Sequence, residues 1–523
     1  MPTPMEEFKD TLRSAKWVST PLVVIRTTDP TSTIQLIAHE LFVPPHVEEA
    51  EVYSTLRWDV VQGFKAVNDA GQTAAQSLNA SEQASFGGEK EPREALVQLQ
   101  LQASREELPT GATVCFANAH RYMNDTGVMQ AIYNLRDCFP EHNQTLVLLT
   151  VPGAKLPGEL SEHVLVLDEP LPMREDLGRV LDDLYEDAQA QNPDLPPIGS
   201  RDRDHATDAL LGLTLFSAQQ AVSMSLTRTG LNLSRLWSRK VQTIQQTPGL
   251  SVWKGNETFD RIAGIDNVKG FLELIMGREH PPGGIMFLDE FEKQLAGHGT
   301  DLSGVKTEMV GTLLTWMQDK KAKGLIFIGP PGTAKTATAK AGGNLIGKPT
   351  IMFDFGGMQA SRVGESGQNL RTALQVVEAV TDSNPLVIAT CNSLSSLPPE
   401  LRRRFTLGTF FFDLPDVEGR RLIWDLYLSL YKLDGELPDD SEWSGADIEN
   451  CCVNASENRV SLKRAAEYIV PAGISSRDQI RQLRLQSSGK YIDAARAGTY
   501  AFDDQESKAQ PSRGRAFVKL AKA

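Results

Sequence analysis

Short apolar runs alternate with helix-type periodicity along residues 1–200 of the chain. The runs have the length and the Val, Ile, Leu and Thr content of buried strands, and Pro, Gly and Asn flank them. They cover residues 22–26, 113–117, 145–150 and 164–167. Strands that alternate with helices favour a mainly parallel sheet covered by helices. Residues 205–246 then show helical periodicity throughout, which predicts a small helical appendage.

The same alternation begins again at residue 259. Apolar runs separated by helical patterns cover residues 284–288, 325–328, 350–353, 386–390 and 409–412. This pattern predicts a second doubly wound α/β unit. After Pro415 the chain is helical through about residue 495, so in each half a sheet is followed by helices.

These patterns divide the chain into successive segments. We expect an α/β module, a helical appendage with a linker, an α/β core, a helical lid and a basic tail, at residues 1–200, 201–254, 255–415, 416–500 and 501–523. A chain of 523 residues is too long for one hydrophobic core, which agrees with at least two large modules.

Charge and cysteine content narrow the classes of function. The formal charge of −14 disfavours non-specific nucleic-acid binding over the whole surface, because such binding depends on Lys and Arg patches. The basic tail after Lys508 leaves a local acidic partner open. The five cysteines form no CxxC pair, so no zinc site or disulfide framework is indicated and a reducing cytoplasm fits. No apolar run of about 18 residues occurs, so no membrane span is expected.

The run GPPGTAKT follows an apolar strand and precedes a helix that opens with Ala337. This is the setting of a P-loop, whose backbone N–H groups surround phosphate at a helix N-terminus. Its residues would be Gly329, Pro330, Pro331, Gly332, Thr333, Ala334, Lys335 and Thr336. Lys335 would reach the β- and γ-phosphates of ATP, and the Thr336 hydroxyl would hold Mg²⁺.

Three further motifs place polar residues after apolar or helical segments. GGIMFLDE ends in Asp289, expected in the Mg²⁺ shell, and Glu290, expected as the general base that polarises the attacking water. LVIATCN ends in Asn392, which would contact the γ-phosphate or the lytic water, or else only form a turn. LPPELRRRF contains Arg403 and Arg404, which would stabilise the transferred phosphoryl group across a subunit boundary, or else form a solvated helix end.

Together the motifs GPPGTAKT, IMFLDE, IATCN, VGESGQNLR and LPPELRRRF resemble those of the AAA+ ATPases, over about residues 259–467. The resemblance implies a P-loop sheet with a helical lid. It also implies a homo-oligomeric ring, commonly a hexamer, with ATP bound between neighbouring subunits. By the same resemblance, the segment IAGID at residues 262–266, which includes Ile265 and Asp266, lines the adenine pocket, and Gly445 and Ala446 lie on the lid helix over the phosphates.

The order of the motifs departs from that family. Its acidic strand ordinarily follows the P-loop, whereas Asp289 precedes Lys335 in this chain. In a parallel sheet such re-threading can leave every strand in its usual place, provided that short links join the displaced helices and strands. We therefore expect permuted connectivity around an intact site, with Asp289 and Glu290 close to Lys335.

Residues 1–250 are similar to a two-module AAA family known from cyanobacteria and plastids, with permuted relatives in phages. The similarity rests on FKDTLRSAKWVSTPLVVIRT, YNLRDCF, LVLLT, VLVLDEPLP and LGLTLFSAQQA. The predicted strand at 22–26 runs into TTDP, with no Gly or Lys to surround a phosphate. The first module is therefore expected to be a degenerate, ATPase-like module.

The expected function is Mg²⁺-dependent ATP hydrolysis that remodels an unknown protein partner. One alternative is a loader or clamp acting on a nucleic-acid machine, which predicts stimulation of the ATPase by DNA. The other is a scaffold that binds ATP with little turnover. Glu290 argues against a scaffold, because a pure scaffold needs no general base.

Overall fold

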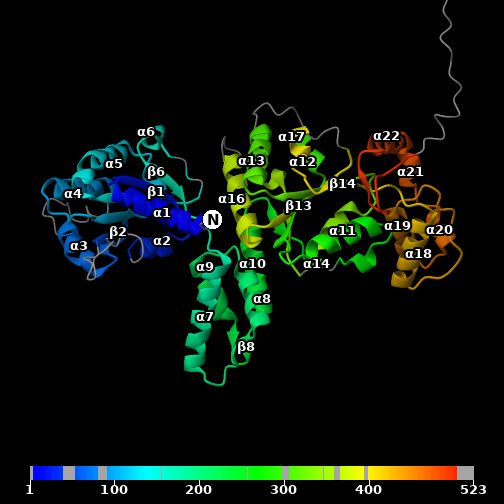
Figure 1. The fold of residues 1–523 in the computed structure, drawn as a ribbon, viewed down its shortest axis with the longest axis horizontal. Helices are drawn as coiled ribbons and strands as arrows, with labels where there is room; N and C mark the ends of the chain where they lie inside the picture. Colours follow the sequence, from blue (N-terminus) through cyan, green and yellow to red (C-terminus); the bar gives the residue numbers. More distant parts are fainter. Residues whose placement is uncertain are drawn as a thin grey trace, which may run out of the picture. The chain divides into compact units, whose positions relative to one another are not determined.

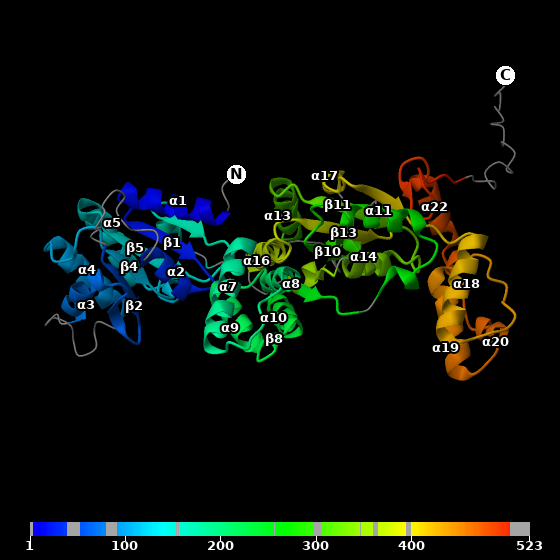
Figure 2. The same cartoon turned by 60° about the horizontal axis from the view of Figure 1, so that its bottom comes forward.

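The computed structural model describes residues 4–38, 53–79, 91–152, 154, 156–255, 257–296, 305–345, 347–358, 365–393 and 399–502. The predicted basic tail lies outside the described residues, apart from positions 501 and 502. Two compact units divide the chain: Met1–Pro248 with Ala360–Asp382, and Gly249–Gln359 with Ser383–Ala523. Figures 1 and 2 show both from two directions.

A sheet in the order β3-β2-β4-β5-β1-β6 forms the centre of the first unit. Its strands are β1 (Leu22–Arg26), β2 (Thr55–Asp59), β3 (Gly63–Ala66), β4 (Thr113–Phe116), β5 (Thr145–Thr150) and β6 (Leu165–Asp168). All neighbours are parallel except the hairpin of β2 and β3. Leu22 and Val24 face one core and Val23 and Ile25 the other, so both faces are covered. The sequence analysis missed β2 and β3, whose segments TLRWD and GFKA are short and partly polar.

Helices cover this sheet and continue beyond it. Those around the sheet are α1 (Pro4–Trp17), α2 (Pro30–Leu36), α3 (Gln72–Asn79), α4 (Pro92–Ser104), α5 (Thr126–Cys138) and α6 (Gly158–Ser161). The appendage consists of α7 (Arg174–Gln191), α8 (Ser200–Leu210), α9 (Leu215–Ser225) and α10 (Leu233–Gln246), with the short strands β7 (Leu226–Thr227) and β8 (Gly230–Leu231). Leu177 and Leu181 of α7 share the core of α8 to α10, so the appendage begins before the predicted boundary at residue 201.

Helix α16 (Glu365–Val380) groups with the first unit, although its sequence lies inside the predicted core of 255–415. The reason is a set of polar contacts with the appendage. The buried Lys240 ammonium donates to the carbonyl oxygens of Asp208 at 2.5 Å and Val380 at 3.3 Å. Arg174 forms ion pairs with Asp208 and with Asp382, and Asp382 lies just beyond Val380, the last residue of α16. Charged groups that are paired in this way can be buried at acceptable cost.

A sheet in the order β15-β14-β11-β13-β10-β12-β9 forms the centre of the second unit. Its strands are β9 (Leu250–Val252), β10 (Gly284–Leu288), β11 (Lys323–Ile328), β12 (Thr350–Phe353), β13 (Pro385–Cys391), β14 (Gly408–Phe411) and β15 (Ile492–Asp493). β10 lies between β13 and β12, parallel to both. The strands β12, β10, β13, β11 and β14 occupy the same places in this sheet as β2, β4, β5, β1 and β6 in the sheet of the first unit. In the sequence, however, β10 precedes β11 and β12, whereas its counterpart β4 follows β1 and β2. The connectivity is therefore permuted, as predicted, while the spatial order of the strands is kept.

The helices of the second unit form two groups. Those of the core are α11 (Asp266–Met276), α12 (Phe291–Ala296), α13 (Val305–Asp319), α14 (Lys335–Leu345), α15 (Phe355–Met358) and α17 (Pro399–Arg402). The lid contains α18 (Val417–Tyr431), α19 (Gly445–Asn458) and α20 (Leu462–Ala466), which share one core around Trp424 and Trp443 and lie together in both views. α21 (Ala472–Ser475) and α22 (Arg477–Ser487) then lead back to β15 at the sheet edge. Two α/β modules with helical attachments are thus confirmed.

The end of β1 in the first unit carries carboxylates where the second unit carries its glycine-rich loop. Asp29 caps α2 through the Ser32 N–H, at 3.2 Å. Glu169, which follows β6, accepts a hydrogen bond from the Thr33 hydroxyl at 2.6 Å, and burial raises the pKa of Glu169. Carboxylates at this position repel phosphate. These contacts support the expectation of a degenerate first module, which stays a prediction.

Candidate functional site

The loop between β11 and α14 in the second unit has little room for side chains. Gly332 has φ +79°, and a Cβ on it would lie 2.6 Å from the Ser444 hydroxyl. A Cβ on Gly329 would lie 2.0 Å from the Phe412 carbonyl oxygen. Glycine meets both constraints without strain, so no side chain occupies the space beside these two positions ahead of α14.

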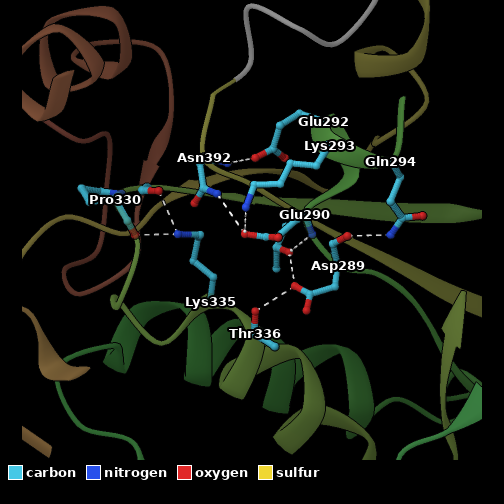
Figure 3. A network of polar contacts seen from close by, with 11 residues as sticks. Asp289, Glu290, Glu292, Lys293, Gln294, Pro330, Lys335, Thr336 and Asn392 are labelled. Carbon is cyan, nitrogen blue, oxygen red and sulfur yellow. Dashed lines mark hydrogen bonds and ion pairs between the residues drawn. The ribbon is translucent and has the colours of Figure 1, made fainter. Parts of the chain in front are cut away.

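Lys335, the first residue of α14, turns its side chain back into the loop (Figure 3). Its ammonium donates to the carbonyl oxygens of Gly329 at 2.8 Å and Pro330 at 2.6 Å. The residue is 7% exposed. Burial lowers the pKa of Lys335 to about 8, against nearby carboxylates that favour its charged form, of which Glu292 acts most strongly.

Asp289 and Thr336 meet although 47 positions separate them in the sequence. The Thr336 hydroxyl donates to Asp289 Oδ1 at 2.8 Å, and the Thr390 hydroxyl donates to the same oxygen at 2.7 Å. The contact exists because Asp289 follows β10, and only β13 separates β10 from β11, the strand that leads into the loop. A carboxylate and a hydroxyl side by side are the hard oxygen donors that Mg²⁺ prefers, and these two residues could hold it together with phosphate oxygens.

Glu290 occupies a left-handed backbone conformation, with φ +45°. Its N–H donates to the Thr390 hydroxyl at 2.9 Å. Its carboxylate oxygen Oε1 receives the Lys293 ammonium at 2.7 Å and the Asn392 amide at 3.4 Å, and Figure 3 shows both side chains pointing at it. The carboxylate is half exposed, so a water molecule can approach it.

Three positioning residues escaped the sequence analysis: Thr390, Glu292 and Gln294. Gln294 Nε2 donates to the Asp289 carbonyl oxygen at 2.6 Å, and its Oε1 accepts the Phe355 N–H at 3.1 Å. Glu292 Oε1 accepts the Asn392 N–H at 2.9 Å. The signal for Thr390 is its strand register, since Ala389 pairs with Leu288 just before the two acids. That register requires the order of the strands, which the linear sequence does not state.

A cavity of about 320 Å³ joins the loop to the lid. Its lining includes Pro331, Gly332, Thr333, Ala334, Lys335, Thr336 and Ala337, together with Glu290 and Asn392. The wall also contains Arg261, Ile262, Ala263, Thr390, Cys391, Ile423, Leu426, Tyr427, Gly445, Ala446 and Glu449. A space of this size, with an apolar end and a polar end, suits a nucleotide.

Ile265 and Asp266 do not line this cavity. Ile265 packs into the hydrophobic core beneath it, and Asp266 begins α11. Both line a neighbouring cavity that shares Gly332, Thr333 and Ala334 with the first. Of the segment expected around the adenine, Ile262 and Ala263 are the residues that the loop cavity contains.

Arg403 and Arg404 also lie away from the cavity. Arg403 is exposed, and Arg404 donates to the Gln318 side chain at 2.5 Å. Neither residue lines the space beside Lys335. Their expected role on the site of a neighbouring subunit is therefore compatible with their exposure and stays a prediction.

Comparisons with known families match both modules. A family described as "SpoVK-like AAA ATPase, N-terminal domain" matches residues 5–169. A family described as "ATPase family associated with various cellular activities (AAA)" matches residues 325–381. The second match contains the loop and Lys335, whereas Asp289 precedes it, in agreement with the permuted order of the strands.

Similar proteins extend over most of the chain. The AAA domain-containing protein ycf46 of Guillardia theta is 24% identical over 445 residues, which are 73% of this chain and 80% of that protein. The ycf46 protein of Trieres chinensis is 22% identical and covers 87% of this chain and 92% of its own length. A proteasome-activating nucleotidase of Saccharolobus islandicus is 28% identical over 209 residues, 29% of this chain and 53% of that protein. With both modules matched and the loop, the acids and the lid in one place, the chain is similar to the AAA ATPases in both of its modules, and its P-loop lies in the second.

Proposed function

We propose that the second unit binds ATP with Mg²⁺ and hydrolyses it. The observation that carries the proposal is the hydrogen bond between Thr336 and Asp289, at 2.8 Å. It joins the P-loop to the acidic strand, and Glu290 follows directly with its carboxylate beside Asn392. A phosphate cradle, an oxygen pair for a metal and a carboxylate base are the parts that hydrolysis of a phosphoanhydride needs.

Each residue has a distinct role in this proposal. The backbone N–H groups of residues 332–334 and those at the N-terminus of α14 bind the phosphates, since Pro330 and Pro331 have no N–H to donate. Lys335 leaves its carbonyl partners to neutralise the β- and γ-phosphates. Thr336 and Asp289 would hold Mg²⁺, which would neutralise charge on the phosphate oxygens. Glu290 orients the attacking water and accepts its proton, and Asn392 holds Glu290 or the water in line.

The proposal extends to a homo-oligomeric ring, commonly hexameric in AAA+ proteins, that acts on a protein partner. Exposed Arg403 and half-exposed Arg404 support a role in trans, because a finger residue must be accessible to a neighbouring subunit. Similarity to a proteasome-activating nucleotidase supports a nucleotide-driven function. The free thiols of the cysteines support a reducing, cytoplasmic setting. No helix in the described part of the chain has the length and apolar content to cross a membrane.

The test is ATP binding by titration calorimetry, with and without Mg²⁺, together with phosphate release at rising protein concentration. Lys335→Ala is expected to weaken binding by about 10- to 100-fold, since it removes a charge-assisted contact. Lys323→Ala, an exposed lysine at the start of β11, is the matched control and is expected to behave as the wild type. Tight ATP binding without turnover would favour the scaffold function, and turnover that only DNA stimulates would favour the loader or clamp. Absence of binding would refute the proposal.

A further inference from the structure

Glu292 is a buried carboxylate beside the proposed catalytic base. It lies on the first turn of α12, which starts directly after Glu290. Its neighbour Lys293 is exposed, whereas Glu292 is 7% exposed. Glutamate is almost never buried to this extent unless a partner offsets the loss of water. The burial of Glu292 therefore calls for a role.

The contacts of Glu292 all lead to the end of β13. Its Oε1 accepts the backbone N–H of Asn392 at 2.9 Å. Its carboxylate also faces Cys391, and burial together with this neighbouring charge raises the pKa of the Cys391 thiol, which therefore stays protonated. Glu292 is also the carboxylate that most favours the charged form of Lys335, against the burial that lowers the pKa of that lysine. The carboxylate of Glu292 thus contacts Cys391, the last residue of β13, and Asn392, which follows it.

One oxygen of Glu292 is left over. Oε2 is buried and lacks a hydrogen bond of ordinary geometry among the described residues, and the neighbouring Cys391 thiol is only a weak donor to this carboxylate. A residue kept only for stability would not bury an unsatisfied carboxylate oxygen, because an apolar side chain of the same size fits such a place at lower cost. Burial of this oxygen costs desolvation free energy. That cost is explained if the other oxygen of Glu292 is needed to hold the Asn392 backbone in place.

Asn392 transmits this constraint to Glu290. Its side-chain Nδ2 lies 3.4 Å from Glu290 Oε1, the oxygen that Lys293 also contacts. Figure 3 shows the resulting series of side chains, from Glu292 through Asn392 to Glu290. The Glu290 carboxylate is held by Lys293, which is exposed, and by Asn392, so a shift of Asn392 would change how the carboxylate is oriented.

We infer that Glu292 is a positioning residue of the hydrolytic site, which fixes the backbone of Asn392 so that the Asn392 amide holds the carboxylate of Glu290 in line. This inference rests on the proposed ATP hydrolysis and deepens it. It assigns Glu292 to turnover, because its hydrogen bond goes to the Asn392 backbone and not to the phosphate loop; since its charge also favours the charged form of Lys335, kcat and the Kd for ATP are compared at pH 7, below the pKa of that lysine.

The test compares Glu292→Ala, Glu292→Gln and the exposed control Glu273→Gln of α11 in steady-state ATP hydrolysis, ATP binding and thermal unfolding. Glu292→Ala is expected to lower kcat by about 10- to 100-fold, with KM and the Kd for ATP within threefold of the wild type. Glu292→Gln keeps an acceptor for the Asn392 N–H and is expected to retain at least a third of kcat. Glu292→Gln is not expected to lower Tm, because it keeps the acceptor and removes the buried charge, whereas Glu292→Ala leaves the Asn392 N–H without its acceptor and is expected to lower Tm modestly.

A double-mutant cycle with Asn392→Ala separates positioning from a general effect on the fold. If Glu292 acts through the Asn392 side chain, Glu292→Ala adds less than a threefold loss in the Asn392→Ala background. Losses that multiply, an unchanged kcat in Glu292→Ala, or a loss of kcat in Glu292→Gln as large as that in Glu292→Ala would each overturn the inference. A wild type that binds ATP and never hydrolyses it would instead refute the proposed hydrolysis, and the role of Glu292 with it.

Discussion

Thr390 provides the sharpest quantitative prediction, because one hydroxyl joins the two acids. It accepts the Glu290 N–H at 2.9 Å and donates to Asp289 Oδ1 at 2.7 Å. Thr390→Val has nearly the same shape and keeps the β-branched side chain that β13 favours. Thr390 is 1% exposed, so water cannot readily replace the lost hydroxyl.

The magnitude follows from the two hydrogen bonds. A hydrogen bond to a charged group contributes about 1.5 to 3 kcal/mol, and a buried donor left without its partner costs about 1 to 3 kcal/mol. Because the two effects share one side chain, they do not add fully, and a combined loss of about 2 to 4 kcal/mol is reasonable. Expressed in the transition state, about 2 kcal/mol corresponds to roughly a 30-fold loss of kcat/KM.

The assay is phosphate release at several Mg²⁺ and ATP concentrations, with Thr390→Ser as the control that keeps the hydroxyl. Thr390→Val is expected to lose at least about 30-fold in kcat/KM and to need more Mg²⁺, whereas Thr390→Ser stays within about threefold. Circular dichroism checks that the valine variant is folded. If Thr390→Val keeps its kcat/KM within threefold of the wild type, the hydroxyl does not organise the acids and the reasoning is wrong.

Three further predictions test other parts of the structure. Because burial lowers the pKa of Lys335 to about 8, the free protein loses this cation as the pH rises through about 8, and ATP then binds with uptake of a proton. The Kd for ATP measured by calorimetry should therefore rise by up to about tenfold per pH unit above that value, and the Kd of Lys335→Met should lack this pH dependence. Gly332→Ala, which brings a Cβ to 2.6 Å from Ser444, should abolish ATP binding, while Gly347→Ala, also at positive φ but in open space, should leave binding unchanged. Lys240→Met should lower the free energy of unfolding by about 2 to 4 kcal/mol in denaturant titrations, because it leaves two carbonyl oxygens without their charged donor, and the neighbouring Arg239→Met should have a small effect. Equal Kd values at pH 7 and 9.5, ATP binding by Gly332→Ala, or equal stability of the two methionine variants would contradict the respective arguments.

Local motifs made much of the site predictable from the sequence. The P-loop is eight consecutive residues between a strand and a helix, so its identity does not depend on distant contacts. Asp289 and Glu290 were located by the apolar run before them, and the parallel sheet explained how they could precede Lys335 in sequence and still face Thr336. The strand order around β10 follows that reasoning.

The remainder depends on tertiary contacts that leave no local signal. Thr390 reads as an ordinary strand threonine until β13 is paired with β10. Glu292 reads as a solvated acid in the run DEFEK until α12 turns it inward. The grouping of α16 with the appendage depends on Lys240, which lies 140 positions from Val380. Long-range pairs of this kind are invisible to periodicity and to motif spacing.

The central claim is that the acidic strand ahead of the P-loop completes the ATPase site. Phosphate release by Glu290→Gln, compared with the wild type at rising protein concentration and with ATP binding measured on the same samples, tests it most directly. The account predicts wild-type turnover per subunit that climbs as the protein assembles, and a Glu290→Gln variant that binds ATP as the wild type does and releases phosphate at least 100-fold more slowly, about 2.7 kcal/mol in the barrier. Wild-type turnover in Glu290→Gln would contradict the account, because the base would then lie elsewhere.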